Sequence, residues 1–271
     1  MAGPKFELNE MSVVILAGGM GTRMQEHTSA LPKPMVRLAE RPILWHIMKH
    51  YSMFGVRRFV ICLGYLGDQI RDYFVNYWRY NRDIQIGLKD HDIQVLPGQD
   101  DPEDWEIILC ETGARTLTAK RVKQVLQRIG QDTFFLTYGD GLASVDVAKT
   151  LSHHRAQNGT LATITAVRPS SRFGELDISG NKITNFHEKP QSSGGWINGG
   201  FMVMEKQAFD HLSIDDDVSL EEGVLSYLAE QHALSVYRHN GFWQCMDTPR
   251  ERDLLEGLWL SGDAPWLRIT S

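Results

Sequence analysis

Cysteine is scarce in this chain. Its three cysteines, Cys62, Cys110 and Cys245, are an odd number among 271 residues and form no CxxC pair. Such wide spacing argues against a disulfide framework and against a zinc site. It favours a protein of the reducing cytoplasm.

Long apolar runs are also missing. No stretch approaches the ~18 apolar residues that a membrane-spanning helix needs, so we expect no membrane partner. The first ten residues include Pro4, Lys5, Glu7 and Glu10 and have no apolar core, unlike a secretory signal. We therefore interpret residues 1–10 as a flexible N-terminal extension.

An excess of positive charge is the third absence. The chain has 28 Lys and Arg against 34 Asp and Glu, a formal net charge of −6. Nucleic-acid-binding proteins usually carry a basic surface, so we expect no nucleic-acid partner. A small anionic ligand stays compatible with this balance, provided that a local cationic pocket binds it.

Short apolar runs alternate with amphipathic segments in the first half of the chain. The apolar runs predict strands at 12–16, 58–63, 105–110 and 133–137. Apolar residues at helical intervals predict helices at 43–54, 68–79 and 117–129. This alternation is typical of a mostly parallel sheet flanked by helices.

The second half of the chain does not continue this regular alternation of strands and helices. It predicts strands at 161–167, 200–204 and 234–238, and a hairpin of 174–178 with 182–187. It predicts helices at 206–212, 220–231 and 249–260. The polar stretch 91–104 is interpreted as a long loop.

The strongest local motif directly follows the first strand and reads Leu16-Ala17-Gly18-Gly19-Met20-Gly21-Thr22-Arg23. A Rossmann fingerprint would need glycine where Met24 stands, and a Walker A motif would need lysine after Gly21, so both are excluded. Glycines let backbone N–H groups approach an anion closely, and an arginine suits phosphate. The glycines alone are equally compatible with a tight turn.

A second cation follows ten residues later. Lys33 lies between Pro32 and Pro34, on a segment with little backbone entropy to lose. Alone it would suggest a surface turn. Together with Arg23 it predicts two cations directed at the same phosphates.

The chain resembles the sugar-1-phosphate nucleotidyltransferases, and in its fuller motif set the glucose-1-phosphate cytidylyltransferases. The motifs that carry this resemblance, beyond GGMGTR and Lys33, are 42–48, 64–65, 138–141, 172–174, 188–190, 197–201 and 241–248. The resemblance implies a Rossmann-like, GT-A-like α/β fold with a small β-rich sugar-binding lobe. It also implies one domain over 11–271, with a nucleotide-binding half at about 11–145 and a sugar-phosphate-binding half at about 146–271.

The same resemblance implies a reaction. CTP and glucose 1-phosphate would give CDP-glucose and pyrophosphate by in-line attack of the sugar phosphate on the α-phosphorus, with Mg²⁺. A different sugar phosphate, a different nucleotide such as dTTP or UTP, and a non-catalytic nucleotide-sugar sensor are the alternatives. The resemblance further implies a homo-oligomer, a trimer or a hexamer.

Site residues follow from the motifs that match. The implied catalytic residues are Arg23, Lys33 and Lys189. The implied nucleotide-binding residues are Leu16, Ala17, Gly18, Gly19, Gly21, Thr22, Arg23, Lys33, Thr112, Gly113, Thr118, Arg121 and Gly139. The implied sugar-phosphate-binding residues are Gly174, Glu188, Lys189, Asn198, Gly199 and Trp243.

Asp140 and Asp247 are the implied Mg²⁺ ligands. Asp140 follows a predicted strand, and ligands of open α/β sheets bind at that edge. Mg²⁺ takes one or two carboxylates together with phosphate oxygens and water. Considered without the resemblance, Asp140 belongs to a Gly-Asp-Gly turn and Asp247 is the N-cap of the last helix.

Three features depart from the family pattern. Leu31 stands where the cytidylyltransferases have a further lysine, Ala119-Lys120 replaces a glycine pair, and Arg115 is unusual. These departures bear on the nucleotide loop and on substrate choice. His46 and His50 stand four residues apart in an apolar helix, for which we expect a structural role.

Overall fold

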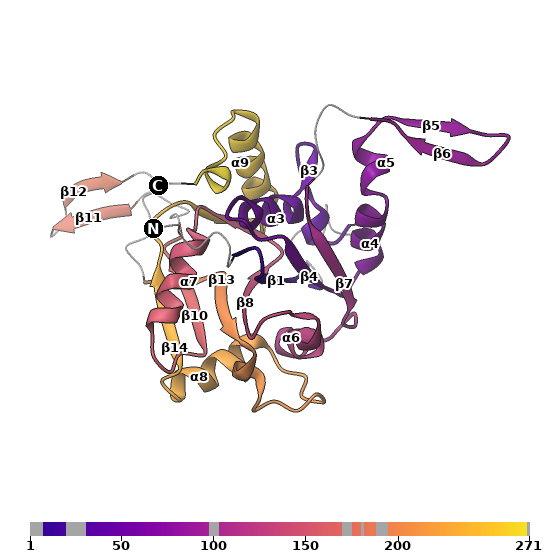
Figure 1. The fold of residues 1–271 in the computed structure, drawn as a ribbon. Coiled ribbons are helices and arrows are strands. Elements are labelled where there is room, and N and C mark those ends of the chain that lie inside the picture. Colours follow the sequence, from indigo (N-terminus) through magenta and orange to yellow (C-terminus); the bar gives the residue numbers. More distant parts are fainter. Residues whose placement is uncertain are drawn as a thin grey trace, which may run out of the picture.

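The computed structural model describes residues 8–19, 31–97, 103–169, 175–179, 182–187 and 195–269. Its centre is a seven-stranded sheet in the order β14-β10-β13-β8-β1-β4-β7 (Figure 1). The strands are β1 (Ser12–Leu16), β4 (Arg58–Leu63), β7 (Glu106–Glu111), β8 (Thr133–Tyr138), β10 (Ala162–Val167), β13 (Ile197–Glu205) and β14 (Leu234–Arg238). Strand β13 runs antiparallel to both of its neighbours and the other pairs are parallel. The sheet is therefore mixed and takes strands from both halves of the chain.

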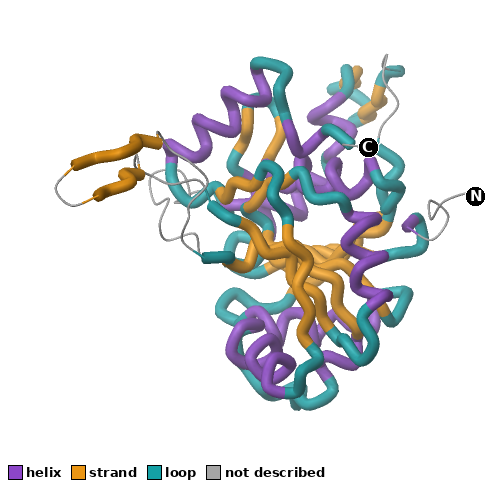
Figure 2. The backbone as a smooth tube through the Cα atoms, turned by 90° about the vertical axis from the view of Figure 1, so that its left-hand side faces the viewer, coloured by secondary structure: helices purple, strands orange, loops and turns teal. Residues whose placement is uncertain are grey.

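Helices cover both faces of this sheet (Figure 2). They are α3 (Ile43–Met53), α4 (Gly67–Val75), α5 (Tyr77–Asn81), α6 (Thr118–Val125), α7 (Val147–Ala156), α8 (Ser226–Glu230) and α9 (Pro249–Leu260). Apolar side chains of α3, α4, α7 and α9 belong to one core cluster, and those of α6 and α8 belong to the other.

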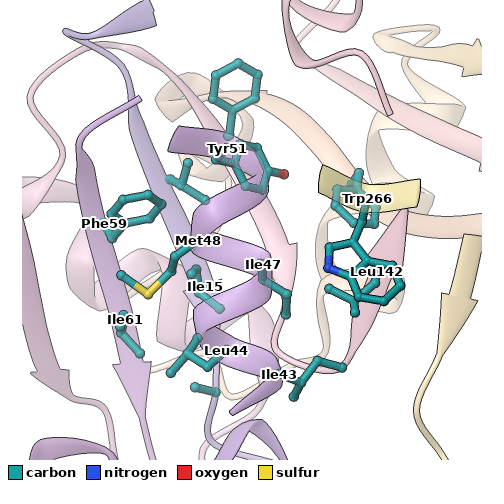
Figure 3. Close-up of a cluster of buried hydrophobic side chains, with 14 of the residues drawn as sticks. Ile15, Ile43, Leu44, Ile47, Met48, Tyr51, Phe59, Ile61, Leu142 and Trp266 are labelled. Carbon is teal, nitrogen blue, oxygen red and sulfur yellow. The ribbon is translucent and has the colours of Figure 1, made fainter. Parts of the chain in front are cut away.

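Strand β1 shows why its sequence is apolar at every position. Val13 and Ile15 pack into the cluster around α3, whereas Val14 and Leu16 pack into the cluster around α6. Successive side chains of a strand point to opposite faces, so a strand covered on both sides needs no polar face. Figure 3 shows Ile15 beside the buried face of α3.

Several predicted helices are shorter than expected. The segment 68–79 is divided at Asn76 into α4 and α5, and 117–129 ends as the 3-10 turn η3 (Leu126–Arg128). The segment 206–212 forms only the 3-10 turn η4 (Lys206–Phe209). The segment 220–231 begins as the π-helical turn η5 (Glu221–Leu225) before α8.

Four two-stranded sheets surround the main sheet. They are β2 (Arg37–Leu38) with β3 (Arg41–Pro42), β5 (Ile84–Gly87) with β6 (Asp92–Val95), β9 (Gly141–Ala143) with β15 (Trp243–Cys245), and β11 (Glu175–Ser179) with β12 (Lys182–His187). The β11–β12 pair confirms the predicted hairpin. The interpretation of 91–104 as a loop was wrong at β6. The strand does alternate polar and apolar residues, but it has only four of them and lies within a polar stretch.

The N-terminal segment and the lengths of the helices complete the description of the fold. Leu8, within the expected N-terminal extension, is buried in the core cluster around α3. Among the described residues, the helices are all too short or too polar to cross a membrane.

Candidate functional site

A pocket of about 600 Å³ opens where β1 and β8 end. These strands are parallel neighbours with Leu16 opposite Tyr138, so the glycine loop and the Gly-Asp-Gly turn leave the sheet side by side. Predicted site residues that line the pocket are Leu16, Ala17, Gly18, Gly19, Lys33, Thr118, Arg121, Gly139, Asp140 and Asp247. The structure thus brings together residues from four distant parts of the sequence.

Arg121 holds the glycine loop through hydrogen bonds to backbone carbonyls. Its guanidinium Nη1 donates to the Leu63 carbonyl at 2.8 Å, and its Nη2 donates to the Gly18 carbonyl at 3.2 Å. A Cβ on Gly18 would lie 2.4 Å from Nη1, so only glycine lets the loop pass this close. Burial lowers the pKa of Arg121. Arg121 lines the pocket, and its guanidinium donates to two backbone carbonyls and to the Thr112 hydroxyl.

Thr112, Gly113 and Thr118 also support the pocket through hydrogen bonds within the protein. The hydroxyl of Thr112 donates to the Leu63 carbonyl at 2.5 Å and accepts from Arg121 Nη1 at 2.7 Å. The Gly113 amide donates to Glu111 at 3.3 Å. The Thr118 hydroxyl accepts from the Leu220 amide at 2.6 Å. Of these three, Thr118 alone is among the pocket-lining residues.

Lys33 lies between the two predicted metal ligands. Its Nζ donates to Asp140 Oδ2 at 2.7 Å and makes a second, shorter contact with Asp247 Oδ1. Burial lowers the pKa of Lys33, but the two carboxylates outweigh burial and raise that pKa above its ordinary value. The pocket wall therefore holds a compact group of one ammonium and two carboxylates.

The β9–β15 pair explains why residues 107 positions apart meet here. Gly141 is opposite Cys245, and the Met246 amide donates to the Asp140 carbonyl at 2.8 Å. Asp140 immediately precedes one strand and Asp247 lies just beyond the other, so both carboxylates are on one side of the pair. Neither strand was predicted.

Asp247 is not the N-cap of α9. Thr248 is the N-cap, because its hydroxyl accepts from the Glu251 amide while Glu251 accepts back in a capping box. Glu251 Oε2 also accepts from the Asp247 amide at 2.7 Å. The cap therefore fixes the Asp247 backbone and leaves the carboxylate directed at Lys33.

The donor set of this group suits a hard divalent cation. Two carboxylates already converge on one cationic atom, the Lys33 ammonium, which acts as a stand-in for a metal ion. Among the residues that the structure describes, no group of three or more His, Cys, Asp or Glu side chains could hold a metal. The two carboxylates of Asp140 and Asp247 therefore fit a divalent cation that prefers oxygen ligands.

Three residues predicted to bind the sugar phosphate are described, and they are not among the residues that line this pocket: Asn198, Gly199 and Trp243. Asn198 and Gly199 are within β13, where Asn198 Oδ1 accepts from the Gly200 amide and the Trp243 indole donates to the Gly199 carbonyl at 2.8 Å. This Asn-Gly-Gly segment is thus part of a strand and not a turn. The remaining predicted positions, Gly21, Thr22, Arg23, Gly174, Glu188 and Lys189, lie outside the described residues.

Six residues of the pocket lining were not among the predicted site residues, and two of them, Tyr138 and Arg115, carry polar groups of interest here. Tyr138 donates to Glu221 of η5, and burial, followed by this hydrogen bond, raises the pKa of its phenol. Arg115 also lines the pocket. With Lys33 and Arg121 it gives the described wall three basic side chains against two acidic ones, a cationic wall in a chain of net charge −6.

The histidine pair of α3 is structural. His50 Nδ1 is 2.7 Å from the Trp266 carbonyl, and the Trp266 indole donates to His46 Nδ1 at 3.3 Å. Burial lowers the pKa of each histidine to about 4.

Comparison with known proteins gives a consistent result. The profile of the family described as "Nucleotidyl transferase" matches residues 12–257. The chain is 44% identical over 257 residues to a glucose-1-phosphate cytidylyltransferase of Salmonella typhi, covering 94% of this chain and 98% of that protein. It is 42% identical to a probable glucose-1-phosphate cytidylyltransferase of Bacillus subtilis, covering 94% and 99%. Among solved structures, HddC from Yersinia pseudotuberculosis shares the fold with a TM-score of 0.66 at 22% identity, covering 92% of this chain and 99% of that one.

Proposed function

The chain belongs to the nucleotidyl transferase family, and from that premise we propose that it is a glucose-1-phosphate cytidylyltransferase. It would transfer the cytidylyl group of CTP to glucose 1-phosphate and release pyrophosphate. The observation that carries this proposal is the 44% identity along 98% of a protein with that activity in its name.

The pocket supports the chemistry of such a transfer. Two polyanionic substrates must meet, and negative charge develops on the leaving pyrophosphate, so catalysis depends on positioning and on electrostatic stabilisation. Backbone N–H groups of Gly18 and Gly19 and the cations Lys33 and Arg23 would bind the triphosphate. Lys189 would bind the sugar phosphate, with Gly174, Glu188, Asn198, Gly199 and Trp243 around the sugar. The roles proposed for four of these residues depend on the sequence motifs alone: Arg23, Gly174, Glu188 and Lys189.

We further propose that the divalent cation is Mg²⁺, held by Asp140 and Asp247. When bound, the ion neutralises phosphate charge at the reacting centre. The two carboxylates would orient it from rigid backbone, since β9 and β15 fix both positions.

The test is pyrophosphate release from CTP, UTP, dTTP, ATP and GTP, each with glucose 1-phosphate and Mg²⁺. We expect CTP to give the highest kcat/KM. The same assay with CTP and a panel of other sugar 1-phosphates measures the specificity for the sugar phosphate. Turnover with another nucleotide and none with CTP would overturn the assignment.

Asp140→Asn provides the site-specific test. Replacing the carboxylate with an amide removes a charged ligand, and we expect kcat to fall by about 10²-fold or more with the fold retained. Asp132→Asn is the matched control, because that carboxylate is exposed on the surface and makes only a distant pair with Lys206. Unchanged turnover in Asp140→Asn would remove Asp140 from the mechanism.

One observation favours a different nucleotide preference as the second candidate. Of the three departures from the family pattern, Arg115 alone lines the pocket, while Lys120 donates to the Asp215 carbonyl outside it. Arg115→Leu in the same nucleotide panel would reveal whether this side chain sets the preference. A sensor without turnover would bind CTP and release no pyrophosphate.

We also propose a homo-oligomer in the cytoplasm. All three cysteines are free thiols, which suits a reducing compartment. Apolar side chains are exposed on α4, on α5 and on the projecting β5–β6 hairpin, including Val75, Trp78, Ile86 and Leu88. Light scattering coupled to size exclusion would measure the mass, and a monomer at micromolar concentration would contradict the proposal.

A further inference from the structure

The ion-pair group of Lys33, Asp140 and Asp247 raises a question that the proposed function does not answer. The side chain of Lys33 is only 12% exposed, and its ammonium contacts one oxygen of each carboxylate. In the proposed reaction, however, Lys33 binds the triphosphate and the two carboxylates bind the metal ion. The arrangement in the structure satisfies neither role.

The backbone around this group is rigid. Lys33 begins the 3-10 turn η2 (Lys33–Met35), between Pro32 and Pro34. Pro34 packs against Gly139, where a Cβ would lie 2.9 Å from Pro34 Cγ, and Asp140 is the next residue. Because these contacts and the β9–β15 pairing hold the three backbones in place, side-chain rotation is the smallest movement that separates the ammonium from the carboxylates.

Charge and geometry make the ammonium and a metal ion alternatives. Two carboxylates and one ammonium leave a net charge of −1, which still attracts a divalent cation. A divalent ion held by the same two carboxylates would compete with the Lys33 ammonium for the point between them. An ammonium and a divalent ion at that point would repel each other strongly in a partly buried site.

We propose that Lys33 is a tethered counter-ion of the metal site. In the nucleotide-free protein its ammonium neutralises and positions Asp140 and Asp247. When a divalent ion enters, the flexible four-carbon stem lets the ammonium rotate away into the pocket that it lines with Gly18 and Gly19. There it meets the phosphates, so this inference rests on the proposed nucleotide site.

The consequence is coupling between metal and nucleotide. A divalent ion that arrives alone must break two ion pairs and leaves the ammonium without an anionic partner. An ion that arrives with a nucleotide supplies phosphates as the new partner of that ammonium. Lys33 therefore lowers the affinity for free metal and makes metal binding favourable chiefly with nucleotide present.

The experiment measures Mn²⁺ binding to the full chain without nucleotide, by electron paramagnetic resonance. Lys33→Met keeps the length of the side chain and removes its charge. We expect this variant to bind Mn²⁺ about tenfold more tightly than the unsubstituted protein, within the usual range of such couplings. Lys120→Met is the matched control, a nearby lysine outside the pocket lining, and it should bind as the unsubstituted protein does. Equal or weaker binding by a folded Lys33→Met overturns the proposal.

A second measurement uses the unsubstituted protein and does not depend on the folding of a variant. Reductive methylation followed by mass spectrometry reports how accessible each lysine amine is. We expect saturating Mg²⁺ to increase the labelling of Lys33 several-fold and to leave Lys149, whose side chain is 63% exposed, unchanged. Labelling of Lys33 that stays constant or falls contradicts the release of the ammonium.

The two proposals fail in different ways. If CTP turnover is normal and metal binding is insensitive to Lys33, the counter-ion role is wrong and the enzymatic assignment stands. If Lys33→Met binds Mn²⁺ more tightly and CTP is not a substrate, the nucleotide assignment is wrong and the counter-ion role stands.

Discussion

At the scale of single residues, Arg121 shows how one side chain organises a site through backbone. It holds the carbonyls of Leu63 and Gly18, which belong to two neighbouring strand ends, and it supports Thr112 as well. A lysine at this position has one nitrogen and cannot reach all three acceptors. The loop that Arg121 holds is the part of the protein expected to contact phosphate.

Arg121→Lys is therefore expected to affect stability and substrate binding together. Buried acceptors that lose a charged donor cost about 2 kcal/mol in the free energy of unfolding, measurable by urea denaturation. We expect KM for CTP to rise more than kcat falls, because the loop is displaced while the reacting groups remain. Arg128→Lys, an exposed position just beyond α6, is the control and should change neither quantity. If the Arg121→Lys variant is less stable but keeps the KM of the unsubstituted protein for CTP, Arg121 contributes to folding and not to substrate binding.

At the scale of elements, the N-terminus of α9 connects helix stability to the metal site. The Thr248 hydroxyl caps the Glu251 amide, and Glu251 Oε2 accepts from the amides of both Asp247 and Thr248. The start of the helix and the position of Asp247 are thus set by the same hydrogen bonds.

Thr248→Ala should destabilise the protein by about 1 kcal/mol, the usual cost of losing such a cap, as measured by denaturant unfolding. We also expect Mn²⁺ binding to weaken, because the backbone of Asp247 loses part of its support. Ser261→Ala, at the other end of α9, removes a hydroxyl that donates to Leu258 and leaves Asp247 untouched. If both variants bind Mn²⁺ equally, the cap does not position the carboxylate.

At the scale of the whole molecule, the buried histidines of α3 make stability depend on pH. His46 and His50 have a pKa of about 4 in the folded protein because burial disfavours the charged form, against an ordinary value of 6.5. Between these values the unfolded chain binds more protons than the folded one. Stability is therefore complete above about pH 6.5 and is lost as the pH falls towards 4, each histidine contributing up to about 1.4 kcal/mol per pH unit.

Urea unfolding at a series of pH values from 7 to 4 tests this expectation. The slope of the unfolding free energy between pH 6 and 4.5 should be shallower in His50→Gln than in the unsubstituted protein, since one titrating group is gone. His91→Gln, an exposed position at the tip of the β5–β6 hairpin, should keep the original slope. An unchanged slope in His50→Gln would show that acid instability arises elsewhere.

The sequence by itself determined the strands of the central sheet, the glycine loop after β1 and the identity of most pocket residues. Apolar runs such as Ser12–Leu16 and glycine-rich turns are local signals that need no partner to be recognised. The positions of Asp140 and Asp247 in the chain were likewise predicted. The β5–β6 hairpin and the π-helical turn η5 were not predicted, because two four-residue strands and a local change of helix type leave little trace in a sequence. The N-cap was assigned to Asp247, although Thr248 and Glu251 have the spacing of a capping box.

Only the tertiary structure decided how these residues meet. Asp140 and Asp247 are neighbours because β9 pairs with β15, two three-residue strands whose register depends on contacts across about a hundred residues. Arg121 serves the loop because α6 packs under β1 and β4, and Lys33 lies between two carboxylates because Pro34 fits against Gly139. A sequence states which charges a protein has, whereas long-range pairing and packing decide which charges neutralise one another.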